Sequence, residues 1–154
     1  MITTTEDFKP IRAKIKSENK KLVFTNGCFD ILHKGHITYL NEAKKLGDIL
    51  IVGVNSDSSV KKLKGDERPV TNEQDRMFAL DNLKAVDYVI LFKEDTPYNL
   101  IKAIEPDVLV KGGDWKVEDI VGSDVVLANG GEVKSLNFVN GYSTSSILEK
   151  IRKL

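Results

Sequence analysis

Both histidines of the chain lie in one glycine-containing stretch, residues 25–36, where His33 and His36 are three positions apart. The stretch follows an apolar, strand-like run and leads straight into a helix-forming segment. A loop that leaves a strand and enters a helix presents free backbone N–H groups and the positive end of the helix dipole to phosphate. Gly27 and Gly35 let the backbone approach a ligand closely, and the imidazoles add two donors. The sequence therefore predicts that a nucleoside triphosphate binds here.

Two motifs in this stretch, T-x-G-x-F-D at residues 25–30 and H-x-G-H at residues 33–36, resemble the signature of the cytidylyltransferase-like family of nucleotidyltransferases. Further segments extend the likeness to the C-terminus, at residues 64–69, 95–97, 111–115 and 143–146. Together they resemble the branch of the family that joins the AMP part of ATP to a heptose 1-phosphate. The resemblance implies an enzyme that takes ATP and a sugar 1-phosphate and forms ADP-heptose and pyrophosphate.

The same resemblance implies roles for individual residues. The histidines would contact the triphosphate and stabilise the transition state, Asp114 and Trp115 would contact ribose and base, and residues 143–145 would hold the β- and γ-phosphates at a helix N-terminus. From its residue type alone, Trp115 could instead fill a surface groove. The expected catalytic residues are His33, His36, Lys64 and Arg76. The expected nucleotide-binding residues are Thr25, Asn26, Gly27, Phe29, His33, His36, Lys111, Asp114, Trp115, Ser143, Thr144 and Ser145.

Nucleotidyl transfer to a phosphate acceptor depends on charge control more than on acid–base catalysis. A phosphomonoester is already anionic near neutral pH, so no strong base is needed. Negative charge builds on the α-phosphate and on the departing pyrophosphate, and positioned cations and N–H donors lower the barrier. The sequence supplies such donors at His33, His36, Lys64, Arg76, Lys111 and residues 143–145. Mg²⁺ carried by ATP would add further positive charge.

A metal site built by the protein itself is not expected. Two histidines three positions apart could be zinc ligands, but the chain has no third histidine and Cys28 is its only thiol. Cys28 is interpreted as a small packed residue. Asp30 could bind a metal or cap a turn, and its neighbours favour the turn.

Length and composition favour one compact domain in the cytoplasm. The 154 residues include 23 Lys plus Arg and 23 Asp plus Glu, so no overall basic field exists for nucleic acid or an anionic membrane. A single cysteine excludes an intrachain disulfide and fits a reducing compartment. No apolar run reaches the roughly 18 residues that span a bilayer, and residues 1–9 lack an apolar signal core.

The alternation of apolar runs with helical patterns predicts a single Rossmann-like α/β domain. Five strands are predicted at residues 20–25, 49–54, 88–92, 107–111 and 133–136. Right-handed crossovers would give a doubly wound parallel sheet, and the resemblance implies the strand order 3-2-1-4-5, with the switch point under the histidines. We divide the chain into an N-terminal helical extension, residues 1–20, and a nucleotidyltransferase domain, residues 21–154.

Three other segments are predicted from their patterns. Residues 6–18 form an amphipathic helix packed on the domain, because apolar residues recur there at helical spacing. Residues 61–69 form a mobile loop, in which Lys61 or Lys62 could take the role given to Lys64, although a charge run taken alone is usually a solvated surface. A last helix begins after Ser143 and buries one apolar side, made of Ile147, Leu148 and Ile151.

Other functions stay open at this point. The chain could be a cytidylyltransferase acting on glycerol 3-phosphate or a phosphoalcohol, although relatives that use CTP often carry an arginine where this chain has residues 140–142. It could also be a non-catalytic nucleotide- or flavin-binding module, since the same topology serves carriers and regulators. The paired histidines favour the enzyme. By resemblance alone, a homodimer is expected, together with a separate sugar kinase upstream, because a chain of 154 residues is too short to include one.

Overall fold

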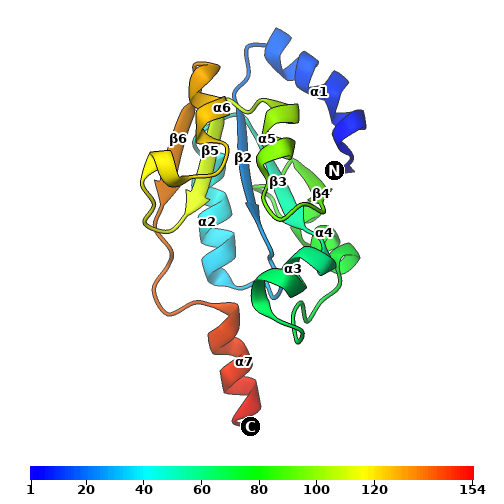
Figure 1. The fold of residues 1–154 in the computed structure, drawn as a ribbon, viewed down its shortest axis with the longest axis vertical. Helices are drawn as coiled ribbons and strands as arrows, with labels where there is room; N and C mark the ends of the chain where they lie inside the picture. The colour runs from blue at the N-terminus through cyan, green and yellow to red at the C-terminus, as the bar shows by residue number, and fades with distance from the viewer.

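The computed structural model describes all 154 residues as one parallel β-sheet with helices on both faces (Figure 1). The strands are β1 (Ile2–Thr3), β2 (Leu22–Gly27), β3 (Ile49–Asn55), β4 (Tyr88–Phe92), β5 (Val108–Gly112) and β6 (Glu132–Leu136). They lie in the order β1-β4-β3-β2-β5-β6, and every neighbouring pair is parallel. The predicted Rossmann-like α/β class is confirmed.

The sheet has six strands, so the predicted number of five is wrong. The additional strand, β1, is two residues long and pairs with Val89 and Ile90 at the outer edge of β4. Two residues are too few to show an alternating pattern, which is why the sequence gives no sign of this strand. The five predicted strands keep the order 3-2-1-4-5 next to it. The switch point therefore lies at β2, between β3 and β5.

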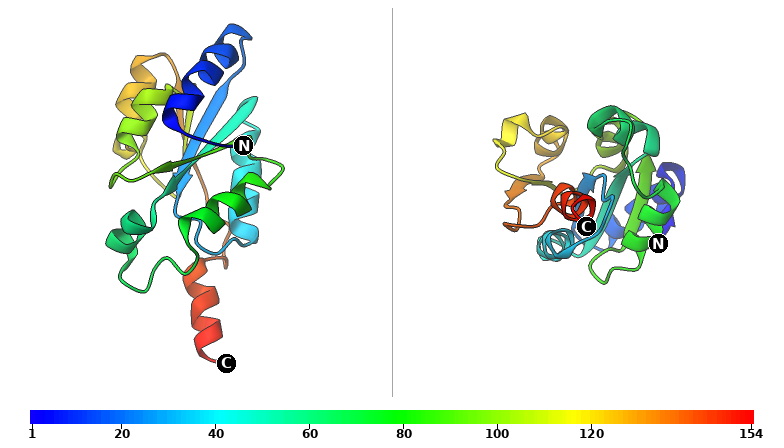
Figure 2. Two further views of the ribbon diagram at one scale, coloured as in Figure 1. Left: turned by 90° about the vertical axis from the view of Figure 1, so that its right-hand side faces the viewer. Right: turned by 90° about the horizontal axis from the view of Figure 1, so that it is seen from below.

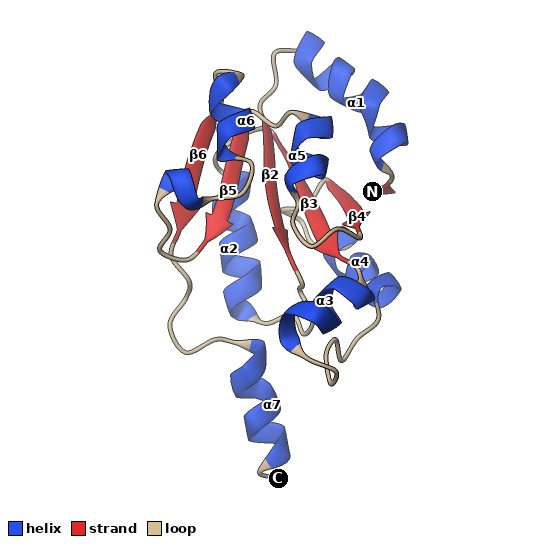
Figure 3. Ribbon diagram, viewed as in Figure 1, coloured by secondary structure: helices blue, strands red, loops and turns tan.

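Two layers of helices cover the sheet (Figure 2, Figure 3). The helices are α1 (Thr5–Ser17), α2 (Lys34–Lys44), α3 (Asp57–Lys64), α4 (Glu73–Asp81), α5 (Tyr98–Ile104), α6 (Ser123–Ala128) and α7 (Thr144–Arg152), with one 3₁₀ turn, η1 (Val117–Asp119). Helices α2 and α4 pack on one face of the sheet, and α1, α5 and α6 pack on the other. None of the helices is both long and apolar enough to cross a membrane.

The core has one half on each face of the sheet. Along β2, Val23 belongs to the half under α2 and α4, while Phe24 belongs to the half under α1 and α5. Phe8 and Ile15 of α1 are buried in this second half, which confirms the predicted amphipathic helix at residues 6–18. This packing fixes the carboxyl ends of β2, β3 and β5 side by side, where ligands bind in open α/β sheets.

Part of the predicted mobile loop at residues 61–69 is helical. Residues 57–64 form α3, which begins at Ser56, whose side chain accepts a hydrogen bond from the backbone N–H of Ser59. Val60 is fully buried and anchors the helix to the domain, while the lysines lie on its exposed side. The prediction failed because a single buried apolar residue in a short helix leaves almost no periodic signal.

The last helix, α7, lacks the buried side that its apolar pattern predicts. It extends away from the sheet (Figure 1, Figure 2), and none of its residues is buried. Ile151 is 55% exposed. The predicted start after Ser143 is confirmed, since the Ser143 side chain accepts a hydrogen bond from the N–H of Ser146. The periodicity thus identified a helix correctly, but the chain covers its apolar stripe only in part, since Ile147 and Leu148 are half-buried and Ile151 is exposed.

Candidate active site

The histidine loop, residues 28–33, joins the end of β2 to the start of α2. His33 is the N-cap of α2, where its Nδ1 accepts a hydrogen bond from Gly35 N at 3.1 Å. In a neutral ring this bond places the proton on Nε2, which is then free to donate. The His36 ring stacks on His33 with centroids 3.9 Å apart. The two imidazoles therefore stand side by side at a helix N-terminus, where the backbone already favours an anion.

Both imidazoles are neutral near pH 7 in the free protein. The pKa of His36 is lowered to about 4, mainly by burial and then by the neighbouring charges of His33 and Lys64. Burial also lowers the pKa of His33. Neutral imidazoles act as hydrogen-bond donors, and a phosphate placed against them would raise both pKa values again. The pair can therefore gain positive charge as an anionic ligand binds.

A pocket of about 480 Å³ opens along the carboxyl ends of β2, β3 and β5. This volume is in the range of small-molecule sites. The lining residues that the argument uses are Gly27, His36, Tyr39, Asn55, Lys64, Arg68, Asp95, Thr96, Lys111, Gly112, Trp115, Phe138 and Thr144. The histidine loop lies between two ends of this pocket, one over β5 and β6 and the other over β3 and β4.

The end over β5 and β6, called here the aromatic end, carries two exposed rings. Trp115 donates a hydrogen bond from Nε1 to the Gly112 carbonyl at 3.1 Å, and the Lys111 ammonium lies 5.4 Å from the indole centroid. Phe138 is 67% exposed and lies beside Gly112, where an added Cβ would come within 2.8 Å of the Phe138 ring. Two rings beside a cation suit a nucleobase that stacks on one face. Phe138 was not among the predicted residues, because a lone aromatic in a loop carries no periodic signal.

Tyr39 forms part of the pocket floor and was also missed by the sequence analysis. Its hydroxyl is 2.5 Å from the hydroxyl of Thr25, and burial raises the pKa of Tyr39 to about 12. Thr25 itself is fully buried and does not line the pocket. Thr25 therefore supports the floor through Tyr39, a pairing between β2 and α2 that sequence spacing does not reveal.

The Asp30 carboxylate fastens the histidine loop to the segment that precedes α4. It is 4% exposed and accepts hydrogen bonds from Arg68 Nε at 2.6 Å and from the backbone N–H groups of Val70 and Thr71 at 2.9 Å. Burial alone would raise the pKa of Asp30, but the hydrogen bonds from Thr71, Val70 and Arg68 outweigh it and lower this pKa. The ionised carboxylate is therefore occupied by protein donors 38 to 41 positions along the chain, which differs from the local turn that its neighbours favoured.

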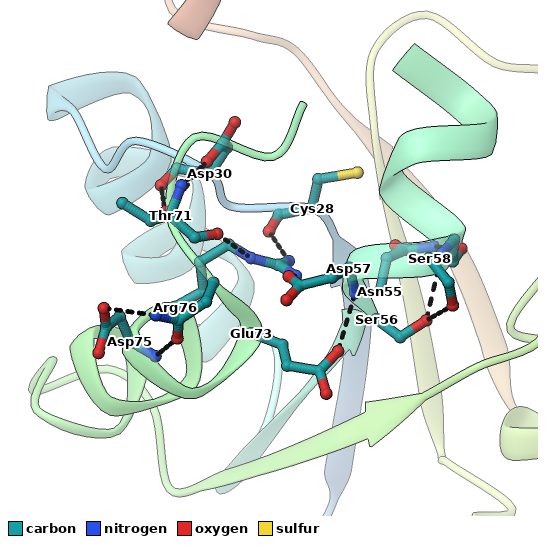
Figure 4. A network of polar contacts seen from close by, with 12 residues as sticks. Cys28, Asp30, Asn55, Ser56, Asp57, Ser58, Thr71, Glu73, Asp75 and Arg76 are labelled. Atoms are coloured by element: carbon teal, nitrogen blue, oxygen red, sulfur yellow. Dashed lines mark hydrogen bonds and ion pairs between the residues drawn. The ribbon is translucent and has the colours of Figure 1, made fainter. Parts of the chain in front are cut away.

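Arg76 makes a second link to the same loop (Figure 4). It is 2% exposed, and its guanidinium donates to the carbonyls of Thr71 at 3.1 Å and Cys28 at 2.6 Å and to the Asp57 carboxylate at 2.8 Å. All three nitrogens are engaged, and Arg76 does not line the pocket. In the free protein Arg76 therefore holds the histidine loop against α3, which differs from the predicted contact with phosphate. An arginine in the first turns of a helix gives no hint of such distant partners.

The start of α7 lies over the histidine loop. The Thr144 hydroxyl donates to the Ile31 carbonyl at 3.3 Å, and the Tyr142 ring stacks over His33 with centroids 6.3 Å apart. Thr144 lines the pocket, whereas the neighbouring Ser143 and Ser145 do not.

The structure brings most of the predicted residues to one pocket. Those that line it are Asn26, Gly27, Phe29, His36, Lys64, Lys111, Trp115 and Thr144, and those that do not are Thr25, His33, Arg76, Asp114, Ser143 and Ser145. Of the three lysines on α3, only Lys64 reaches the pocket. His33 does not line the pocket itself, but its ring stacks on the ring of His36, which does. No three His, Cys, Asp or Glu side chains come together as metal ligands would.

Comparison with known proteins places the chain in a family. The family described as cytidylyltransferase-like matches residues 24–150, so the chain belongs to the cytidylyltransferase-like family. Among curated relatives, bifunctional protein HldE of a Nitratiruptor species is 55% identical over 147 residues, which are 96% of this chain and 31% of that protein. Bifunctional protein HldE of Haemophilus influenzae (strain PittGG) is 56% identical over 99% of this chain and 32% of that protein. The chain thus spans about a third of the length of the curated relatives it matches.

Solved structures show the same architecture. The lipopolysaccharide core biosynthesis protein from Thermoplasma volcanium has 32% sequence identity and a TM-score of 0.64, and the match covers 80% of this chain and 99% of that one. Pantothenate synthetase from Thermus thermophilus has a TM-score of 0.61 over 99% of this chain and 70% of its own. The identity to the synthetase is 14%, so that likeness concerns the fold alone.

Proposed function

We propose that this protein transfers AMP from ATP to a heptose 1-phosphate, forming ADP-heptose and releasing pyrophosphate. The family and the HldE relatives support nucleotidyl transfer. The motif resemblance supports the heptose, and the similar structure described as a lipopolysaccharide core biosynthesis protein fits a sugar destined for a surface glycan. The observation that carries the proposal is the stacked pair His33 and His36 at a helix N-terminus beside a pocket at the switch point.

The reaction needs a bound nucleotide, a bound acceptor and control of negative charge. An oxygen of the sugar phosphate attacks the α-phosphorus of ATP, a new P–O bond forms, and the bond from that phosphorus to the oxygen bridging the β-phosphate breaks. The acceptor oxygen is already ionised near pH 7, so no proton has to be removed. Pyrophosphate leaves with the electron pair of the broken bond. The protein is therefore asked for orientation and electrostatic stabilisation rather than for a general base.

The residues around the histidine loop suit these tasks. The imidazoles and the free N–H groups at the start of α2 would donate to phosphate oxygens, and their positions are fixed before the ligand arrives by the Asp30 and Arg76 contacts. Lys64 and Lys111 would flank the triphosphate from opposite ends of the pocket. The base would stack at the aromatic end. Mg²⁺ would enter with the triphosphate as part of the substrate and neutralise charge on the leaving group.

The direct test is a matrix of nucleotides and acceptors. ATP, CTP and GTP are each offered with heptose 1-phosphate, hexose 1-phosphates and glycerol 3-phosphate, and pyrophosphate release is followed. We expect release with ATP and heptose 1-phosphate well above every other pair. Release mainly with CTP and glycerol 3-phosphate would establish the cytidylyltransferase instead. Absence of pyrophosphate with every pair would favour a non-catalytic binding module.

Partners and place in the cell follow as parts of the same proposal. We propose that a separate sugar kinase acts upstream to supply the sugar phosphate, and ATP supply fits the cytoplasm. Homodimerisation stays a proposal from resemblance, and the partly exposed apolar stripe of α7 fits an unassigned contact. Sedimentation of the purified protein would measure the oligomeric state.

A further inference from the structure

The end of the pocket over β3 and β4 is called here the polar end, and of its lining residues only Lys64 has a role in the nucleotide contacts described above. It is lined by the last residue of β3, by the C-terminal half of α3 and by the segment between β4 and α5. Its lining residues are Asn55, Leu63, Lys64, Arg68, Asp95, Thr96 and Pro97. The histidine loop separates it from the aromatic end. A second reactant that meets the α-phosphate at the histidines would therefore occupy the polar end.

Asn55 is a buried side chain with an unused acceptor in this region. It is 4% exposed and lines the pocket, and Figure 4 shows it where β3 enters α3. Its amide nitrogen donates to the Ser59 hydroxyl at 2.9 Å, which fixes the orientation of the group. Its amide oxygen accepts no hydrogen bond from the chain. A polar atom of a buried side chain that lines a pocket and has no protein partner is available to a donor on a ligand.

Asp95 and Thr96 add further acceptors across from Asn55. Both are exposed and line the pocket, on the segment that leads into α5. The Asp95 carboxylate is 3.5 Å from the Lys62 ammonium of α3, an exposed pairing that leaves the carboxylate open to other donors. The Thr96 hydroxyl makes no hydrogen bond within the chain. Together with the Asn55 amide, these groups offer mainly acceptor atoms, whereas a phosphate requires donors.

The polar end also contains two cations, so it has a positively charged part and a part that carries hydrogen-bond acceptors. The Lys64 ammonium lies at the pocket, and Arg68 uses only its Nε to bind Asp30, so that its two terminal nitrogens remain free. A phosphate fits the cations, and several hydroxyl groups fit the acceptors. A polyhydroxylated phosphate ester satisfies both parts at once. An acyl chain would leave the carboxylate and the amide oxygen unpaired.

We infer that Asn55, Asp95 and Thr96 form the subsite that binds the hydroxyl groups of the acceptor sugar and sets acceptor specificity. This inference rests on the proposed function. The sugar hydroxyls donate to the Asp95 carboxylate and to the Asn55 amide oxygen, while Thr96 either donates or accepts. The sugar phosphate then lies between the polar end and the histidines, with one oxygen directed at the α-phosphate. A hydroxyl-binding site rejects acceptors that lack the matching hydroxyl, because its own polar groups would stay unpaired.

Steady-state kinetics of Asp95→Asn and Thr96→Val test the inference. Asp95→Asn keeps the size of the side chain but removes its charge, so we expect the KM for heptose 1-phosphate to rise about tenfold or more, with the KM for ATP within about twofold of wild type. Thr96→Val removes one neutral hydroxyl and should raise the same KM about threefold. Asp66→Asn is the matched control, because Asp66 is an exposed carboxylate that faces an α3 lysine, Lys61, at 3.8 Å but lies outside this pocket.

The outcomes separate this inference from the proposed function. A rise in the acceptor KM for Asp95→Asn and Thr96→Val, with no change for Asp66→Asn, supports the subsite. An unchanged acceptor KM in both pocket variants, in a protein that still makes ADP-heptose, overturns the subsite alone. A rise in the KM for ATP in place of the acceptor KM would assign the polar end to the nucleotide and also overturn it. Wild-type protein that releases no pyrophosphate with any sugar phosphate overturns the proposed function, and the subsite with it.

Discussion

The histidine loop and the start of α7 were both predicted to hold phosphates, but the fold supports them very differently. The loop is tied down by Asp30, which accepts three backbone or side-chain N–H donors, and by Arg76, whose guanidinium is fully engaged. Helix α7 has no buried residue and is linked to the domain by an exposed ion pair from Arg152 to Glu67 and by the hydroxyl of Thr144.

The contrast separates two ways of building an anion site. In the histidine loop the donors are fixed before the ligand binds, so little ordering is required at the moment of binding. The N-terminus of α7 belongs to a helix that makes few contacts with the domain. Part of the free energy of phosphate binding is therefore spent on ordering that helix. We therefore expect changes in the loop to cost more than changes in α7.

His36→Ala should have the largest effect on activity. It removes a donor from the pocket, and losing one such group typically lowers turnover by about 10² to 10³. Pyrophosphate release gives the turnover, and the thermal midpoint shows whether the fold is intact. His33→Ala should behave similarly, although less steeply, because His33 reaches the pocket through its partner. Near-normal turnover in both variants would remove the histidines from the catalytic residues.

Two arginine variants compare how much the histidine loop and α7 each contribute to the free energy of unfolding. Arg76→Met leaves the Cys28 and Thr71 carbonyls and the Asp57 carboxylate without their donor, so we expect a loss of about 2–3 kcal/mol in the free energy of unfolding, together with lower turnover. Arg152→Met breaks only an exposed pair on α7 and should cost less than about 0.5 kcal/mol. Urea unfolding measures both. Equal losses would contradict the proposed difference between the regions.

Stability should fall when the pH is lowered from 7 to 5. The pKa of His36 is about 4 in the folded chain against 6.5 as the reference value, so the unfolded chain binds more protons between these values. The contribution of His36 to the free energy of unfolding is fully present above pH 6.5 and is lost as the pH falls toward 4. Allowing for partial exposure, we expect a loss of about 1 kcal/mol by pH 5. His36→Gln should remove most of this dependence, since only the smaller contribution of His33 remains.

Amide hydrogen exchange should reveal a difference in local stability between α7 and α2, the smallest of the effects expected here. Amides of α7 should exchange faster than those of α2 in the free protein, because α7 buries no side chain whereas α2 packs Leu40 and Ala43 into the core. Binding of ATP should slow exchange at the start of α7 while leaving the centre of α2 unchanged. Equal protection of both helices without ligand would argue against a loosely held α7.

The sequence predicted what depends on local pattern and missed what depends on distant partners. The order of five strands, the cap at Ser143 and the buried face of α1 all follow from spacing and residue type. The partners of Arg76 are 5 to 48 positions away, and only the folded chain brings them together. The apolar stripe of α7 illustrates the opposite error, because periodicity reports that a face is apolar and says nothing about what covers it.

The most direct test of the histidine loop uses the two imidazoles themselves. Since the chain has only two histidines, their ring signals can be followed by NMR while MgATP is added across a pH series. The account predicts that both signals shift on binding and that the pKa of His36 rises from about 4, because an anion at the ring favours its protonated form. Saturating ATP that leaves both signals and both pKa values unchanged would contradict it.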